Sequence, residues 1–239
     1  MSNVNKQWLV IAAVVATSIS AVAVPVPVTV TRVPGYFSGS GGEFTISGSP
    51  WANTPPYNSV ALVGGGFQTF CVELNEHVIM GNTYLAELNL KAVNGGVGGG
   101  SPDPLSIGAA WLYKQFAEGN LFGYDYTLAG RAASAALLQE AIWWLEDEIT
   151  SLSGPNPFLA QLSTPAWISS YGSNPKADYD PSTAGFNVRV INMWGADANG
   201  NIDKNQPKQD MLVYLPDGGM TLVLLGAGLL GVAAIRRKE

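Results

Sequence analysis

Two apolar segments near the ends of the chain mark off the part that can form a folded core. One runs from Trp8 to Val24 and the other from Met220 to Ile235. Between them lie roughly 190 residues, which is enough for one domain with a sizeable core, or for one domain with a subdomain. We therefore divide the chain into an N-terminal segment 1–23, a folded part 24–214 and a C-terminal segment 215–239.

The N-terminal segment has the pattern of a secretory signal peptide. Lys6 precedes the apolar run, and Ala21-Val22-Ala23 supplies the small-x-small pattern that signal peptidase cleaves after. We expect residues 1–23 to be removed and the mature chain to begin at Val24. The alternative is an uncleaved N-terminal anchor, which the prolines at 25 and 27 disfavour.

The C-terminal apolar run predicts a short helix in a membrane. It is about 16 residues long, slightly less than the roughly 18 to 20 residues that a helix needs to cross a bilayer. The basic residues Arg236, Arg237 and Lys238 follow it and would hold that end in the cytoplasm. Everything before Met220 is then expected on the other side of the membrane.

A short motif stands in front of this apolar run. It consists of Leu215, Pro216, Asp217, Gly218 and Gly219. Together with the apolar run and the basic end it resembles the PEP-CTERM sorting signal, most closely the VPDSG-CTERM variant, with leucine in place of valine and glycine in place of serine. The resemblance covers about a tenth of the chain.

That resemblance implies an exported protein of the cell envelope, outer surface or extracellular matrix. An exosortase-like membrane protease would recognise the motif and remove the tail, so the protein would be held in the membrane only transiently. The alternative is an ordinary C-terminal membrane anchor without processing, and both alternatives place the folded part outside the cytoplasm.

Composition excludes several classes of function. The net charge is −6 with no basic patch, which argues against a nucleic-acid partner. The chain has one histidine and one cysteine, so it has neither a His-rich metal site nor an internal disulfide, and we expect no metal and no cofactor. A lone cysteine is unusual in an exported protein, because an unpaired exposed thiol is open to oxidation.

Three segments before residue 75 have the alternation and β-branched or aromatic composition of strands. They are Val28 to Val33, Glu43 to Ser47 and Gly66 to Leu74. In a regular third strand, Phe70, Val72 and Leu74 face the core, while Cys71 and Glu73 share the opposite face. Because both faces carry apolar groups, we expect another layer, such as a helix, over this strand.

The middle of the chain predicts helices. Residues 102–104 can open one helix through Trp111, a second runs from about Ala129 to Thr150, and a third, interrupted at Pro165, covers Pro155 to Ser170. In the second helix the apolar positions follow a buried stripe, and Glu146, Asp147 and Glu148 are expected at its exposed end. The helices would form an insertion between about 102 and 170.

Strands return near the end of the folded part. Phe186 to Trp194 and Gln209 to Tyr214 predict a hairpin, joined by a polar loop with Asn199-Gly200. That loop has alternating oxygen side chains from Asp197 to Asp203, but it lacks the glycine and glutamate of an EF-hand, so we expect a solvated turn. The fold class is α+β, mainly an antiparallel β-sandwich or barrel with a helical insertion.

Two segments carry suggestive chemistry. Phe70-Cys71-Val72-Glu73 on a strand and Gln139-Glu140-Ala141-Ile142-Trp143 on a helix resemble the signature segments of bacterial surface thioester domains of the TQXA type. The resemblance implies that the Cys71 thiol attacks the Gln139 carboxamide, releases ammonia and leaves an internal thioester. A surface amine or hydroxyl could then become linked through Gln139, as in a covalent adhesin of a biofilm or matrix. Such a bond needs the two side chains in contact in a dry pocket.

Neighbouring side chains could assist that reaction. Glu73 and His77 are candidates for proton transfer, and Trp143 for the pocket wall. The alternative is that Cys71 is a buried structural residue and Gln139 an ordinary helix former.

Other functions have weaker support in the residues. A conventional enzyme is not expected, since a cysteine hydrolase would have only His77 as its base and paired carboxylates arise by chance among 18 acidic residues. The stronger alternative is a non-covalent structural or glycan-binding matrix protein, because the chain has seven tryptophans and nine tyrosines for stacking on polysaccharide. Most of these, including Trp111, Trp143 and Trp194, are expected in the core.

Overall fold

A computed structural model describes residues 25–49, 51, 57–95, 97 and 100–215 of the 239 in the chain. The predicted signal peptide, the residues of the sorting motif from Pro216 onward, the apolar tail helix and the basic end lie outside the described residues. No helix in the described ranges is long and apolar enough to cross a membrane.

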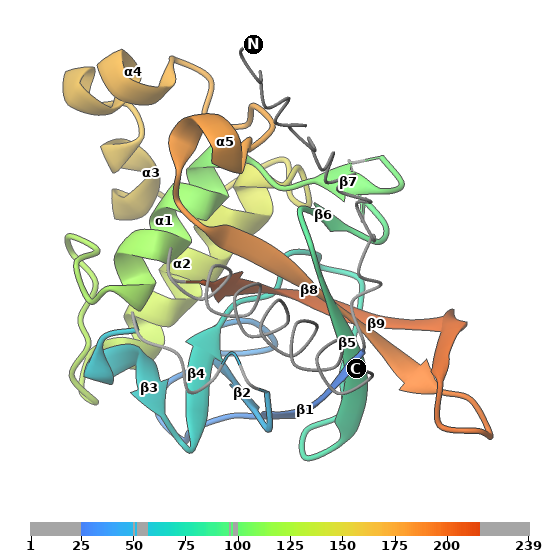
Figure 1. The fold of residues 1–239 in the computed structure, drawn as a ribbon. Coiled ribbons are helices and arrows are strands. Elements are labelled where there is room, and N and C mark those ends of the chain that lie inside the picture. The colour runs from blue at the N-terminus through green and yellow to red at the C-terminus, as the bar shows by residue number, and fades with distance from the viewer. Residues whose placement is uncertain (1–24, 50, 52–56, 96, 98–99, 216–239) are drawn as a thin grey trace, which may run out of the picture.

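An antiparallel sheet of seven strands is the main element of the fold (Figure 1). Its spatial order is β3-β4-β2-β1-β5-β8-β9, and every neighbouring pair is antiparallel. The strands are β1 (Val26–Thr31), β2 (Phe44–Ser47), β3 (Leu62–Val63), β4 (Gly66–Thr69), β5 (Thr83–Asn89), β8 (Val188–Ala196) and β9 (Ile202–Tyr214). The α+β class is therefore correct, with predominantly antiparallel strands.

The segment that follows β4 pairs with the last strand. Val72 N donates to Asp210 O at 3.0 Å, Leu212 N donates to the Phe70 carbonyl at 3.3 Å, and Cys71 forms an isolated bridge with Met211. The predicted strand from Gly66 to Leu74 is thus too long, because the chain leaves β2 after Thr69 and turns toward β9. This change of partner places the segment after β4 beside β9, which is the last strand in the spatial order of the sheet.

The helices lie between β7 and β8, and the chain forms a small second sheet before them. That sheet consists of β6 (Lys91–Ala92) and β7 (Asp103–Pro104), and a 3₁₀ turn η2 covers Ser59–Ala61. The helices are α1 (Ile107–Ala117), α2 (Arg131–Leu145), α3 (Pro157–Gln161), α4 (Pro165–Tyr171) and α5 (Pro181–Ala184). They continue past the predicted limit at residue 170, because Asp180 caps one further helical turn.

Local sequence explains where the helices begin. The side chains of Ser106, Asn156 and Thr164 accept hydrogen bonds from the first turns of α1, α3 and α4. Pro157 and Pro165 occupy the first helical positions, where their missing N–H groups leave no hydrogen bond unmade. The predicted interruption at Pro165 is confirmed as the start of a separate helix.

Helices α1 and α2 pack together, and α1 also packs against β8 and β9 (Figure 1). The core between these layers is apolar and aromatic, with Phe70 and Phe116 in edge-to-face contact at 5.0 Å between ring centroids. Each large side chain fully buried here contributes about 1.5–3 kcal/mol to folding. The prediction that a helix covers the Cys71 segment is confirmed.

The acidic residues after α2 correct a prediction. Glu146 and Glu148 are buried, and only Asp147 is exposed. Asp147 adopts a positive φ of 59°, which turns its two neighbours inward. There Glu146 accepts from the Ser106 hydroxyl at 2.5 Å, and Glu148 accepts from the backbone N–H of Leu74 at 2.7 Å. Hydrogen bonds from Ser106 and from loop backbone groups thus satisfy these carboxylates.

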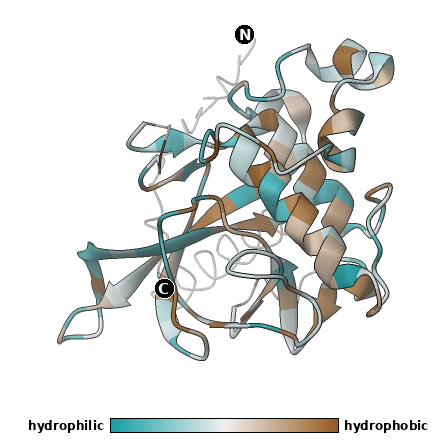
Figure 2. Ribbon diagram, turned by 180° about the vertical axis from the view of Figure 1, so that it is seen from behind, coloured by the Kyte–Doolittle hydropathy of each residue, from teal (hydrophilic) through white to brown (hydrophobic). Residues whose placement is uncertain are grey.

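The predicted terminal hairpin is confirmed as β8 and β9, and its outer part projects from the rest of the molecule (Figure 1). In its connecting turn, Asp197 accepts hydrogen bonds from the backbone of Asn199 and Asn201, both at 2.8 Å. Figure 2 shows hydrophilic residues along the projecting part of the hairpin. The carboxylate of Asp197 is engaged by its own turn, as in an ordinary Asx turn.

Candidate functional site

Cys71 and Gln139 lie in direct contact. Cys71 N donates to Gln139 Oε1 at 3.0 Å, and Gln139 Nε2 donates to the Cys71 carbonyl at 2.9 Å. The two residues are 68 positions apart in sequence, on the segment after β4 and on α2. Their exposed fractions are 3% and 1%, so the contact is nearly dry. The structure therefore brings together the two residues that the sequence analysis singled out.

Close packing holds the Gln139 side chain against the Cys71 backbone. Gly41 lies over it, and a Cβ atom at position 41 would be 2.6 Å from Gln139 Cγ and 2.8 Å from Trp143 Cη2. Real Cβ atoms do not come so close to other heavy atoms, so only glycine fits here without a shift. The loop before β2 thus forms one wall of the site, a feature that the sequence analysis missed.

A cavity of about 270 Å³ opens beside Cys71. Its lining includes Cys71, Arg32, Glu76, His77, Trp143 and Gln209. Trp143 Nε1 is buried and has no hydrogen-bond partner among the described residues. His77 lies in the irregular segment after Cys71, as expected, and is exposed to solvent. Glu73 is not part of the cavity lining.

The electrostatic surroundings keep the thiol protonated. Burial raises the pKa of Cys71 well above its ordinary value, the Arg32 guanidinium opposes this rise, and Glu73 and Glu76 add to it. Arg32 is fixed by the Gly39 and Ser40 carbonyls and stacks on the Phe44 ring at 4.0 Å. A protonated buried thiol reacts slowly with reagents in solution. The chemistry open to Cys71 is that with a group held next to it.

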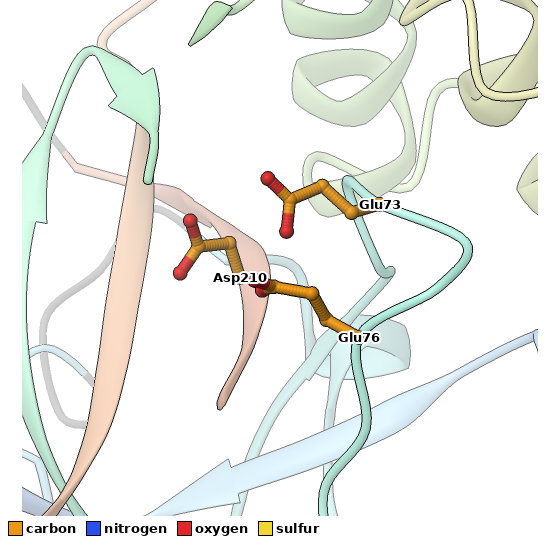
Figure 3. A group of neighbouring side chains, drawn as sticks. All are labelled: Glu73, Glu76 and Asp210. Carbon is orange, nitrogen blue, oxygen red and sulfur yellow. The ribbon is translucent and has the colours of Figure 1, made fainter. Parts of the chain in front are cut away.

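Three carboxylates converge between the segment after Cys71 and strand β9. Sequence reasoning did not find this group. Glu73, Glu76 and Asp210 each place an oxygen within 4.8 Å of the others (Figure 3). Burial is the main cause that raises the pKa of Glu73 well above its usual range, followed by the neighbouring carboxylates, and burial raises the pKa of Asp210 to about 8. Asp210 is on β9, far from Glu73 in sequence, so no spacing could have indicated the contact.

A second hollow lies on the helical side of the molecule. It has a volume of about 430 Å³ and is lined by Trp111, Phe122, Trp167, Tyr171, Gln161 and Thr164, among others. Phe122 is 81% exposed. Of the three tryptophans expected in the core, Trp194 is buried, whereas Trp111 and Trp143 are only partly buried and line the two hollows.

The chain was compared with protein-family models, with curated proteins and with solved structures, and none of the three comparisons gives a match. The fold and the site therefore define the class of protein by themselves. It is an α+β protein with a buried cysteine–glutamine pair beside a cluster of carboxylates.

Proposed function

We propose that the protein is an exported surface or matrix protein that attaches covalently to its target through a thioester between Cys71 and Gln139. The observation that carries this proposal is the pair of hydrogen bonds between the Gln139 carboxamide and the Cys71 backbone. They hold the Gln139 carboxamide, whose carbon is the electrophile, against the backbone of the residue that carries the thiol. Such positioning replaces an unfavourable bimolecular encounter.

The chemical step requires no cofactor. Cys71 Sγ attacks Gln139 Cδ, an S–C bond forms, the C–N bond breaks, and the thiol proton leaves with the amide nitrogen as ammonia. Negative charge develops on Gln139 Oε1 during the attack, where the Cys71 N–H already donates at 3.0 Å. The near absence of solvent at both residues then protects the thioester from hydrolysis.

A nucleophile would reach the thioester through the cavity beside Cys71. An amine or hydroxyl of a surface polymer attacks the carbonyl carbon, becomes linked to Gln139 as an amide or ester, and returns the proton and electron pair to the Cys71 thiol. His77 lines this cavity and can accept the proton of an incoming amine, and Trp143 forms part of the cavity wall.

Export and sorting belong to the same proposal. A signal peptidase would remove residues 1–23, and an exosortase-like protease would process the tail that begins at Leu215. The described part is consistent with this order, because β1 begins only at Val26 and β9 ends at Tyr214. We further infer that the sheet forms a barrel, since residues 70–72 pair with β9.

The intact mass of the purified full-length chain tests the thioester. We expect a mass about 17 Da below that of the unmodified chain, and an adduct after incubation with methylamine. The Cys71→Ala variant keeps the backbone groups that bind Gln139, so it should fold but show neither the deficit nor the adduct. An unmodified mass with a titratable thiol in folded protein would rule out the covalent mechanism.

A second candidate function is non-covalent glycan binding at the aromatic hollow beside α1 and α4. The favouring observation is its ring-lined wall, with Phe122 almost fully exposed, because exposed rings stack on sugar faces. A panel of immobilised polysaccharides tests this function. Phe122→Ala should weaken retention while Cys71→Ala leaves it unchanged, and equal retention of Phe122→Ala and the parent chain would exclude the hollow.

A further inference from the structure

The carboxylate cluster described above carries buried oxygens that no protein group satisfies. Four such oxygens lack a hydrogen-bond partner among the described residues: both of Glu73, Oε2 of Glu76 and Oδ1 of Asp210. Glu73 is 98% buried, and Figure 3 shows its carboxylate directed at the other two. Unpaired buried carboxylate oxygens are costly to fold, so a ligand that binds them is expected.

The other oxygens of the cluster are used to orient it. Asp210 Oδ2 accepts from Val93 N at 2.6 Å and from Asn192 Nδ2 at 2.8 Å, and Glu76 Oε1 accepts from Asn94 Nδ2 at 2.8 Å. Each of these two carboxylates thus has one oxygen fixed by the protein and one oxygen free. This division is typical of metal-binding carboxylates, whose outer hydrogen bonds set the direction of the free oxygen.

No cation in the described part of the chain forms an ion pair with the cluster. The ion pairs among the described residues involve Glu43, Glu87, Glu118 and Asp147, and none includes a member of the cluster. The amide of Asn192, which donates to Asp210, also has a buried carbonyl oxygen without a partner. The unpartnered polar atoms of the cluster and of Asn192 are therefore all oxygen atoms.

We propose that Glu73, Glu76 and Asp210 bind one calcium ion. Calcium takes six to eight oxygen ligands in irregular geometry, and four free carboxylate oxygens completed by water or the Asn192 carbonyl suit it. Magnesium is a poorer fit because it demands near-ideal octahedral geometry and gives up its waters reluctantly. Glu76 also lines the cavity beside Cys71, which gives an ion a route to the site.

The ion would join two distant parts of the chain. Glu73 and Glu76 belong to the loop after Cys71, whereas Asp210 belongs to β9. A bound ion would therefore fasten the Cys71 loop to the last strand. This proposal does not depend on thioester formation, since none of its ligand atoms takes part in that reaction.

Thermal unfolding of the purified full-length chain, stripped with EDTA and then titrated with calcium, tests the site. We expect about 5 mM calcium to raise the Tm by ~3 °C or more, and equal magnesium to raise it much less. Glu73→Gln and Asp210→Asn should each abolish the shift. Both are isosteric and remove a buried charge, so they should fold in EDTA at least as well as the parent chain.

Asp203→Asn is the matched control, because Asp203 lies in the other oxygen-rich segment of the chain, near the β8–β9 turn, and forms only local hydrogen bonds. It should keep the full calcium shift. No shift in the parent chain, an equal shift with magnesium, or an undiminished shift in both cluster variants would each overturn the assignment. Intact mass measured on the same samples reports the thioester separately, so the two proposals can fail independently.

Discussion

At the residue scale, the position of the Gln139 carboxamide depends on a glycine that makes no hydrogen bond to it. A methyl group at position 41 would overlap Gln139 Cγ and the Trp143 ring. We predict that Gly41→Ala destabilises the fold by about 1–3 kcal/mol through overpacking. It should also move the carboxamide and so reduce the methylamine adduct several-fold.

Gly154→Ala is the appropriate control for this prediction. A Cβ atom there meets nothing within 4 Å, and the residue has no positive φ. It should change neither the urea midpoint nor the adduct yield. If Gly41→Ala behaves in the same way, Gly41 does not hold Gln139 in place.

The residue scale also shows where sequence reasoning was sufficient. Cys71 and Gln139 were identified because each lies in a short segment that resembles a signature segment of bacterial surface thioester domains. Gly41 and Asp210 lie in segments without such features, and their roles arise from contacts across the fold. A glycine that allows close approach and an acid on a strand look ordinary until their neighbours are known.

At the element scale, the end of α2 is built around a buried acid. Glu146 accepts a hydrogen bond from the Ser106 hydroxyl. The nearby carboxylates of Asp103 and Asp147 help to raise the pKa of Glu146, and Asp147 is itself paired with Lys176. Burial raises the pKa of Glu146 to about 8 from an ordinary 4.5. Between those pH values the folded state holds a proton that the unfolded chain has released, so stability falls as pH rises.

We predict that Glu146→Gln removes this dependence. The amide resembles the protonated acid, so the free energy of unfolding should decline less steeply from pH 5 to 8, by up to ~1.4 kcal/mol per pH unit. Urea denaturation at several pH values measures the slope. Parallel curves for the parent and the variant would show that Glu146 is ionised in both the folded and unfolded states.

Element boundaries were predictable where the signal is local and failed where it is not. Asparagine and threonine caps and first-turn prolines account for the starts of α3 and α4. The start of α1 was predicted too early, at residues 102–104, because Asp103–Pro104 forms β7 and the helix begins only after its Ser106 cap. The end of α2 was misjudged, because three consecutive acidic residues are usually exposed to solvent. Here only Asp147 is exposed, and Glu146 and Glu148 are buried. The end of β4 was misjudged because alternation continues past Thr69, whereas the hydrogen-bond partner changes from β2 to β9.

At the scale of the whole molecule, a buried ion pair ties three separate regions together. Arg131 at the start of α2 binds both oxygens of Glu43, at 2.6 and 2.8 Å, and donates to the carbonyl of Val60 in η2 at 2.6 Å. Tyr124 donates to the same Glu43 carboxylate at 2.5 Å. The helical layer is thereby fastened to the loop that carries Gly41.

We predict that Arg131→Met destabilises the protein by about 3–5 kcal/mol, because it leaves a buried carboxylate without its cation. The double variant Arg131→Met with Glu43→Gln should recover a substantial part of that loss, since no uncompensated charge then remains. Urea denaturation measures both. A double variant no more stable than Arg131→Met alone would show that the loss is one of packing.

The class of the fold could be predicted from the sequence, but the pairing of residues 70–72 with β9 could not. Alternating strands and periodic helices gave α+β, yet the pairing of residues 70–72 with β9 joins positions about 140 apart. Such pairing leaves no periodic trace in either segment. The same is true of the carboxylate cluster, which exists only because this pairing places Asp210 beside Glu73.

The late position of β9 in the chain has a consequence for the timing of assembly. A polypeptide is synthesised from its N-terminus, so Cys71 and Gln139 are both made before residues 202–214, which form β9. Until then the Cys71 segment has no edge to pair with, and neither a dry pocket nor a complete ring of carboxylates can exist. Any reactive bond at Cys71 would therefore be formed last, after synthesis of the folded part is complete.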